Sequence, residues 1–186
     1  MRKYNFLLVM LVAILAISCS QSSSDTQVSN LGTKWHWDKG TIVIETPERP
    51  TGQTSVIGLK APKMEFVRVG FVGLGMRGPA AVERFTYIPG VEIVALCDYE
   101  KERAEECQKL LKKASMPEAT VYSGEKGYEE LCKRDDIDLV YIATDWLHHF
   151  PVAMCAMENG KHTAIEVPSA MSLKECWALI DMSEKT

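Results

Sequence analysis

Three glycines spaced as G-x-G-x-x-G are the residues of this sequence best suited to hold a charged ligand. Gly73, Gly75 and Gly78 directly follow the apolar run Val67–Val72. Such a turn leads a buried strand into a helix whose first N–H groups can bind phosphate. Gly73 permits the tight turn, Gly75 lets the backbone approach a phosphate, and Gly78 lets the helix pack closely on the strand. Glycine-rich turns are common, so the surrounding elements must decide whether this one binds a nucleotide.

An acidic residue lies where a dinucleotide site requires one. Asp98 ends the apolar stretch Val91–Asp98, about twenty residues after Gly78. A carboxylate at the end of a second strand can accept hydrogen bonds from an adenosine ribose, and it repels a 2′-phosphate. The pattern therefore predicts NAD as the cofactor and disfavours NADP. The alternative is an aspartate that ends a strand by chance.

Strands and helices alternate from about residue 65 to the end of the sequence. The apolar patterns predict strands at 65–72, 91–98, 120–122, 137–144 and 162–166, and helices at 79–86, 102–114, 128–133, 150–159 and from 173 onward. The strands are almost wholly apolar, as expected when helices cover both faces of a sheet. The expected fold class is therefore α/β, with a doubly wound parallel sheet of the Rossmann type.

The N-terminal residues are typical of an export signal rather than of a fold. A short basic start precedes an apolar run at 6–17 that is too short to span a bilayer. Leu15–Cys19 resembles a bacterial lipobox, with Ala16 where leucine is usual. We expect residues 1–18 to be a lipoprotein signal peptide and Cys19 to carry lipid, which places the protein in a bacterial cell envelope, on the periplasmic or outer-membrane side. A cleaved signal without lipid and an uncleaved anchor are the alternatives.

The remaining chain divides into an arm and one domain. We expect residues 19–62 to be a tether and an extended arm, with a short strand near Thr41–Glu45, and residues 63–186 to be the NAD-binding domain. The formal net charge of −4 argues against a nucleic-acid-binding surface. Five cysteines follow Cys19 without CxxC spacing or a neighbouring histidine cluster, so we predict buried thiols and no metal site.

Later motifs resemble the N-terminal half of the Gfo/Idh/MocA oxidoreductase superfamily. The matching stretches are Asp138–Thr144, His149, Ala156–His162 and Glu166–Pro168. Members usually carry Glu-Lys-Pro after the fifth strand, and the lysine is a catalytic acid/base in many of the dehydrogenases. Here that position is Val167, which departs from the standard sugar dehydrogenase mechanism.

Glu166-Val167-Pro168, Met76-Arg77-Gly78 and Trp146-x-x-His149 together look like one branch, the family 109 glycoside hydrolases, which are NAD-dependent α-N-acetylgalactosaminidases. Besides the glycines and Asp98, the resemblance implies NAD contacts from Met76, Arg77, Trp146, Leu147, His148, His149, Glu166 and Val167. Glu166 would also border the sugar, and it is the catalytic candidate. The alignment of His149 with the superfamily histidine implies a cofactor-pocket role for it. The residues themselves suggest a surface position for His148 and, because a flat side chain follows the end of a strand, a wall beside the cofactor ring for Trp146.

The resemblance also implies a reaction. NAD would take a hydride from C3 of a terminal N-acetylgalactosamine-type sugar, elimination would expel the leaving group, and the hydride would return after water adds. An exported enzyme could then recycle one retained NAD. The alternatives are an NAD(P)-dependent sugar oxidoreductase and a non-catalytic NAD-binding remnant. The superfamily's C-terminal substrate domain is absent from this sequence, so we expect NAD binding without turnover. A homo-oligomer is an open alternative.

Overall fold

The computed structural model describes residues 26–28, 34–46 and 48–186, and these fall into two compact units that divide at Pro47/Glu48. The expected signal peptide and Cys19 lie outside the described residues. In the part of the chain that the structure describes, no helix is long and apolar enough to cross a membrane. The second unit begins at Glu48, whereas the sequence suggested a boundary at residue 63.

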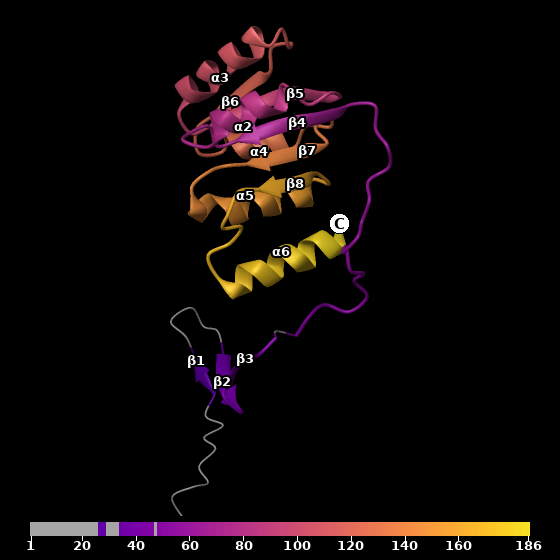
Figure 1. The fold of residues 1–186 in the computed structure, drawn as a ribbon, viewed down its shortest axis with the longest axis vertical. Helices are drawn as coiled ribbons and strands as arrows, with labels where there is room; N and C mark the ends of the chain where they lie inside the picture. Colours follow the sequence, from indigo (N-terminus) through magenta and orange to yellow (C-terminus); the bar gives the residue numbers. More distant parts are fainter. Residues whose placement is uncertain (1–25, 29–33, 47) are drawn as a thin grey trace, which may run out of the picture. The chain divides into compact units, whose positions relative to one another are not determined.

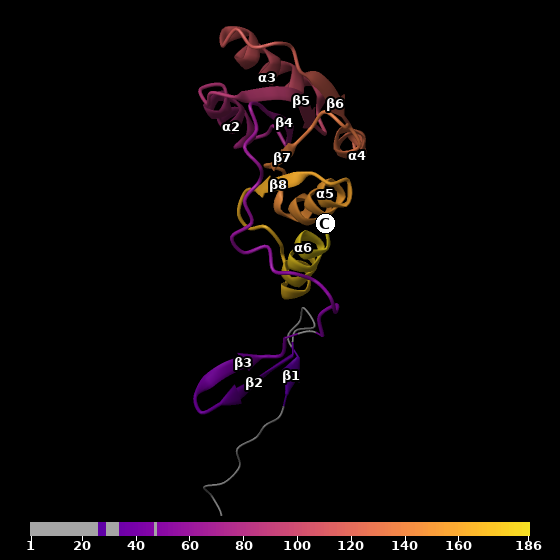
Figure 2. The same cartoon turned by 90° about the vertical axis from the view of Figure 1, so that its right-hand side faces the viewer.

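The first unit contains a small antiparallel sheet, in the order β1-β2-β3 (Figure 2). Its strands are β1 (Gln27–Val28), β2 (Lys34–Asp38) and β3 (Thr41–Ile44). Lys39 and Gly40, both with positive φ, form the two-residue turn between β2 and β3. The short strand predicted near Thr41–Glu45 is therefore present. Within the predicted arm, β2 pairs with β1 on one edge and with β3 on the other, so this stretch forms a sheet.

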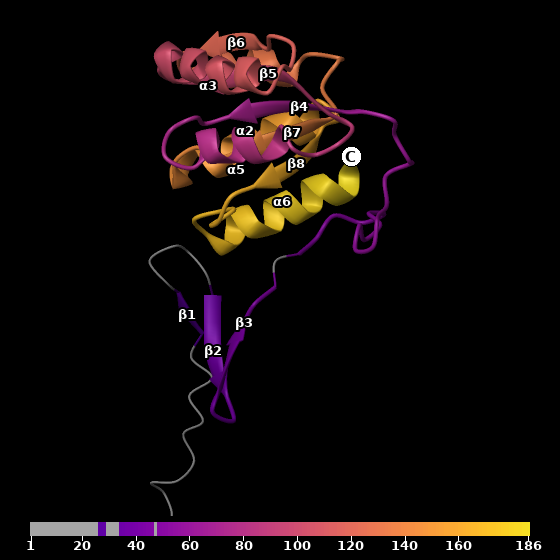
Figure 3. The same ribbon diagram turned by 45° about the horizontal axis from the view of Figure 1, so that its top comes forward.

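The second unit is a five-stranded parallel sheet in the order β6-β5-β4-β7-β8, which confirms the predicted doubly wound fold (Figures 1 and 3). Its strands are β4 (Val67–Val72), β5 (Val91–Asp98), β6 (Thr120–Ser123), β7 (Leu139–Ile142) and β8 (His162–Ile165). Its helices are α2 (Gly78–Phe85), α3 (Lys101–Lys113), α4 (Gly127–Cys132), α5 (Trp146–Glu158) and α6 (Leu173–Lys185).

The central strand β4 is buried on both faces because successive side chains point to opposite sides of a sheet. Val69 and Phe71 pack with residues of α2 and α3. Val72 packs on the other side with residues of α4 and α5. This two-sided core explains why the strands lack polar alternation. It also holds the glycine turn after Val72 in place at the carboxyl-terminal end of the central strand.

Helix α5 begins at Trp146 and not near Phe150 as predicted. Asp145 caps it by accepting a hydrogen bond from the Leu147 amide at 2.9 Å. Proline is most favourable in a first helical turn, so Pro151 would suit a helix that starts at Phe150. The structure instead accommodates Pro151 within the helix. Four of the predicted site residues therefore form the first turn of a helix.

Candidate dinucleotide site

The first glycine lies where the strand order of the sheet reverses, between β4 and β7, which is the usual ligand position in doubly wound sheets. Gly73 has a φ of +91°, and a Cβ built on it would lie 2.4 Å from the Thr144 nitrogen and 2.6 Å from the Ala143 oxygen. Neither the conformation nor the space admits a side chain. The turn after β4 is thus pressed directly against the end of β7.

The other two glycines differ in what surrounds them. A Cβ on Gly78 would lie 2.2 Å from the Gly73 oxygen, so Gly78 permits α2 to pack against the turn. A Cβ on Gly75 would approach only Nη1 of Arg103, at 3.6 Å, among the described residues. Gly75 therefore faces open space that a phosphate could enter. The adjoining N-terminus of α2 has no acidic residue in its first turn, which leaves its positive end available to an anion.

Asp98 is only 6% exposed, and its carboxylate is already bonded to the glycine turn. The Leu74 amide donates to Oδ2 at 2.6 Å, and the Glu100 amide donates to Oδ1 at 3.0 Å. Nη1 of Arg103 lies 3.4 Å from Oδ1. Asp98 thus stands at the end of β5 as predicted, and it also fixes the turn that would hold the pyrophosphate.

Arg103 is a site residue that the sequence reasoning missed. It projects from the first turn of α3 toward both Asp98 and Gly75. The sequence could have indicated Arg103 by its position five residues after Asp98, near the start of the helix that follows the second predicted strand. Its guanidinium places a positive charge beside the carboxylate that was expected to reject a 2′-phosphate.

The first turn of α5 exposes three of the predicted cofactor contacts. Trp146, Leu147 and His148 are all exposed, as are Met76 and Arg77 in the glycine turn. Nδ1 of His148 lies 2.6 Å from Oδ2 of Asp145, in agreement with its expected surface position. Burial raises the pKa of Asp145, but hydrogen bonds from His148 and the Leu147 amide outweigh burial and hold the pKa below its ordinary value. Trp146 stands at a helix start and not at a strand end as expected.

His149 is buried at 1% exposure and connects two strand ends. Its Nδ1 lies 2.7 Å from the Pro168 carbonyl oxygen, and its Nε2 lies 3.0 Å from the Thr144 carbonyl oxygen. Both partners are backbone acceptors, and each neutral tautomer of the ring carries one N–H, so the ring contacts the chain after β7 and the chain after β8 and donates to one carbonyl at a time. The structure therefore places this predicted pocket residue behind the site, where it can position the surrounding backbone.

The loop Glu166–Ser172 after β8 is held at both ends as well. The Tyr141 hydroxyl donates to Oε1 of Glu166 at 2.6 Å. Burial and this hydrogen bond both raise the pKa of Tyr141. At the other end, Oε2 of Glu175 accepts from the Ser172 amide at 3.1 Å, as part of the predicted capping box. The ring of Tyr141 packs against the core, and its hydroxyl contact could not be read from sequence spacing.

Val167 is 81% exposed on this loop, next to the restrained Glu166 carboxylate. A valine side chain can neither donate nor accept a proton. The position therefore offers an apolar surface at the mouth of the site and no acid/base group.

Of the five thiols predicted to be buried, Cys97, Cys107 and Cys132 are buried, Cys155 is half-buried, and Cys176 is exposed, so the prediction was wrong for Cys176. Burial raises the pKa of Cys97 to about 12 and that of Cys107 to about 11, so both thiols are protonated at neutral pH. Within the described residues, no cluster of histidine, cysteine or acidic side chains could hold a metal ion.

These features fit a bound dinucleotide. The open space at Gly75 and the N-terminus of α2 would take the pyrophosphate, and Asp98 would lie beside the adenosine ribose. Trp146 follows β7 at the start of α5, and Glu166 and Val167 follow β8, so all three lie beyond the carboxyl-terminal ends of two paired parallel strands. The fold and the site together define an NAD-binding Rossmann domain.

Comparison with known families agrees with this class. Residues 67–186 match the family described as "Oxidoreductase family, NAD-binding Rossmann fold". The chain therefore belongs to the Gfo/Idh/MocA oxidoreductase family.

Proteins of high sequence identity carry a glycosidase family name. "Glycosyl hydrolase family 109 protein 5" from Phocaeicola vulgatus is 70% identical over 187 residues, which cover 100% of this chain and 36% of that protein. A family 109 protein from Porphyromonas gingivalis is 58% identical over 78% of this chain and 31% of its own length. The chain thus spans about a third of the length of the curated relatives that it matches.

Two solved structures with this fold are dehydrogenases by name. Myo-inositol dehydrogenase from Lactobacillus casei, in complex with NAD(H) and myo-inositol, is 27% identical with a TM-score of 0.57 over 65% of this chain and 34% of its own. The UDP-N-acetylglucosamine 3-dehydrogenase GnnA from Acidithiobacillus ferrooxidans is also 27% identical, with a TM-score of 0.52 over 66% of this chain and 35% of its own.

Proposed function

We propose that this chain is the NAD-binding part of a glycosidase that acts on terminal N-acetylgalactosamine-type sugars. The relatives named as family 109 glycosyl hydrolases support this proposal, because one of them is 70% identical over 100% of this chain. Since those relatives are about three times as long, the activity, the sugar and the partners of the whole protein all belong to the proposal.

The exposed Val167 is the observation that carries the choice of reaction. The resemblance to the superfamily implies that a lysine at this position acts as the acid/base in many of the dehydrogenases. Valine is 81% exposed here and cannot do so. This substitution argues against the usual sugar dehydrogenase mechanism and supports the branch with Glu-Val-Pro.

The chain's own residues would hold the cofactor and border the sugar. When bound, NAD would supply reversible hydride acceptance from a sugar carbon. The amides of the glycine turn would bind its pyrophosphate, and Asp98 would accept from a ribose hydroxyl. Glu166, restrained by Tyr141, would present a fixed carboxylate to the sugar. A 3-dehydrogenase of an N-acetylhexosamine derivative has the same fold, which is consistent with oxidation at C3.

A second candidate is an NAD(P)-dependent sugar oxidoreductase. The similar solved structures favour it, since they include a dehydrogenase that holds NAD(H) and a polyol. The guanidinium of Arg103 beside Asp98 is compatible with either cofactor. A non-catalytic NAD-binding remnant is the third candidate, and it would retain the site without turnover.

We also propose export as a lipoprotein anchored through Cys19. The basic start, the short apolar run and the lipobox-like Leu15–Cys19 support this location. Labelling of cells with a radioactive fatty acid would test it. Label is expected in the parent chain and should be lost in Cys19→Ser, and label that persists in the variant would refute attachment at Cys19.

A chimera tests the reaction. Residues 1–186 are joined to the remaining C-terminal residues of the 70% identical relative, and the product is assayed on an aryl α-N-acetylgalactosaminide with NAD. A glycosidase releases the aryl group without accumulating NADH, whereas an oxidoreductase accumulates NADH. Binding of NAD without either signal would support a non-catalytic NAD-binding remnant.

The 186-residue chain alone is expected to bind NAD without turnover. Robust release of the aryl group by that chain would contradict this expectation.

A further inference from the structure

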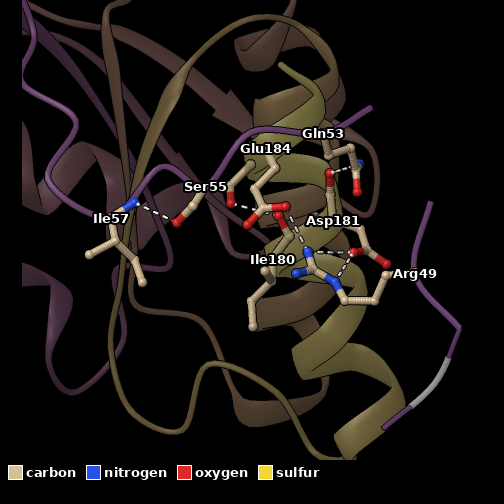
Figure 4. Close-up of polar contacts among 8 residues, drawn as sticks. Arg49, Gln53, Ser55, Ile57, Ile180, Asp181 and Glu184 are labelled. Carbon is tan, nitrogen blue, oxygen red and sulfur yellow. Dashed lines mark hydrogen bonds and ion pairs between the residues drawn. The ribbon is translucent and has the colours of Figure 1, made fainter. Parts of the chain in front are cut away.

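Residues before the Rossmann sheet contact the outer side of α6 within the second unit (Figure 4). Nε and Nη2 of Arg49 donate to Oδ1 of Asp181 at 3.0 and 2.8 Å, and Nη2 also donates to Oε2 of Glu184 at 2.7 Å. The guanidinium carbon lies 5.3 Å from the centre of the Trp177 ring. Nε2 of Gln53 donates to the Asp181 carbonyl oxygen at 2.7 Å.

The sequence of α6 explains why the helix needs this partner. Trp177, Asp181 and Glu184 are spaced i, i+4 and i+7, so they form one stripe along the helix. Two carboxylates three residues apart repel each other, and both lie near a helix C-terminus, where the macrodipole disfavours negative charge. One guanidinium that bonds both carboxylates and stacks on the tryptophan offsets both effects.

Burial alone holds α6 only weakly. None of its 13 residues, all of which are described, is fully buried. Leu179 packs against the core beneath, while Leu173 and Ile180 are exposed. The contacts with Arg49 and Gln53 therefore add to the packing of α6 against α5 in fixing the helix.

Helix α6 also carries the end of the site loop. Glu175, in its first turn, accepts hydrogen bonds from the amides of Met171 at 2.7 Å and Ser172 at 3.1 Å. These residues end the loop that begins with Glu166 and Val167. A displacement of α6 would therefore release the loop at one end.

We propose that Arg49 and Gln53 form a clamp that holds α6 in place and, through α6, fixes the loop Glu166–Ser172 at the cofactor site. Residues 48–53 would then stabilise the NAD-binding domain, although they precede residues 67–186, which match the family model. Arg49 is a positioning residue in this proposal. The inference depends on NAD binding and not on the type of reaction.

Hydrogen exchange of the complete chain tests the clamp. In Arg49→Met, the amides of α6 should exchange about tenfold faster, while those of β4 stay unchanged, because only local opening is affected. Lys60→Met is the matched control, since Lys60 is an exposed cation on the same leading segment. Equal α6 exchange in Arg49→Met and Lys60→Met would overturn the proposal, and so would a uniform increase across β4 and α6.

A second set of variants keeps the test valid if Arg49→Met does not fold. The double variant Asp181→Asn/Glu184→Gln removes the partner charges, and it should loosen α6 as Arg49→Met does. Adding Arg49→Met to it should cause little further change, because one interaction cannot be lost twice. Fully additive effects would show that the residues act separately and would refute the clamp.

Calorimetric titration with NAD tests the link to the site. The dissociation constant should rise about threefold or more in Arg49→Met and stay at the parental value in Lys60→Met. Faster exchange in α6 with an unchanged NAD affinity would refute the connection between the clamp and the loop.

Discussion

Substituting the three glycines one at a time should separate the stability of the turn from its ability to bind the cofactor. In Gly73→Ala the new methyl group would meet backbone at 2.4–2.6 Å, at a φ of +91°. Left-handed backbone costs a non-glycine residue about 1–2 kcal/mol, and overpacking adds about 1–3 kcal/mol. The obstacle is the backbone of Ala143 and Thr144 directly after β7, which cannot withdraw without disturbing the sheet. We therefore expect a loss of about 2–5 kcal/mol in the free energy of unfolding.

Gly75→Ala should behave in the opposite way. Its methyl group would have one neighbour, Nη1 of Arg103 at 3.6 Å, which is an ordinary contact. The free energy of unfolding should therefore change by less than about 1 kcal/mol. The methyl group would occupy the space through which a pyrophosphate reaches the backbone, so NAD affinity should fall at least about tenfold, or about 1.4 kcal/mol.

Urea unfolding and calorimetric titration with NAD measure the two quantities on the same samples. Gly78→Ala serves as the comparison, since its methyl group would lie 2.2 Å from the Gly73 oxygen and should destabilise the domain despite the higher helix propensity of alanine. The reasoning fails if Gly75→Ala binds NAD like the parent, or if it unfolds as readily as Gly73→Ala.

Three further substitutions test other parts of the site and the sheet. Asp98→Ala should weaken NAD binding by about 1–2 kcal/mol in calorimetry, because it removes a charged acceptor. His149→Phe should lower the urea midpoint and weaken NAD binding, since it removes the imidazole that lies within hydrogen-bond distance of the Thr144 and Pro168 carbonyls. Asp138 accepts from Arg68 at 2.6 and 2.9 Å, and this bond lowers the pKa of Asp138. The pair's contribution should be complete above the unfolded-state pKa of an aspartate and be lost as pH falls through the lower, folded-state value. Asp138→Asn should remove that part of the pH dependence in urea titrations.

Each of these expectations has a result that contradicts it. Unchanged NAD affinity in Asp98→Ala would exclude its ribose role, and the absence of NAD binding by the parent would exclude the cofactor site in this chain. Parental stability in His149→Phe would show that its two contacts are not needed. An unchanged pH dependence in Asp138→Asn would assign the acid sensitivity to other carboxylates.

The parts of the fold that local chemistry determines could be predicted from the sequence. Strand β5 has the predicted bounds, Val91–Asp98, because its apolar run is bordered by clear turn residues. The capping box of Ser172 and Glu175 is present because it depends only on residues three positions apart. The start of α5 could not be predicted, since Asp145 provides a good cap while Pro151 suggests a later start.

The contacts that shape the site join residues far apart in the chain. The glycine turn and Asp98 follow a known spacing and were found. Tyr141 meets Glu166 only because β7 and β8 pair in a particular register, and no local pattern reports that register. Arg49 meets Asp181 across an even longer separation, and the weak patterning of its segment gave no indication of a partner.

The hydrogen bond from the Leu74 amide to Asp98 fixes the glycine turn before any ligand arrives. A ligand that enters a turn already ordered loses less conformational entropy on binding than one that must first order it. Differences in affinity among related complexes come mainly from how slowly the ligand leaves. The buried carboxylate should therefore lengthen the residence time of the cofactor, so that one molecule can remain bound through many encounters with other ligands.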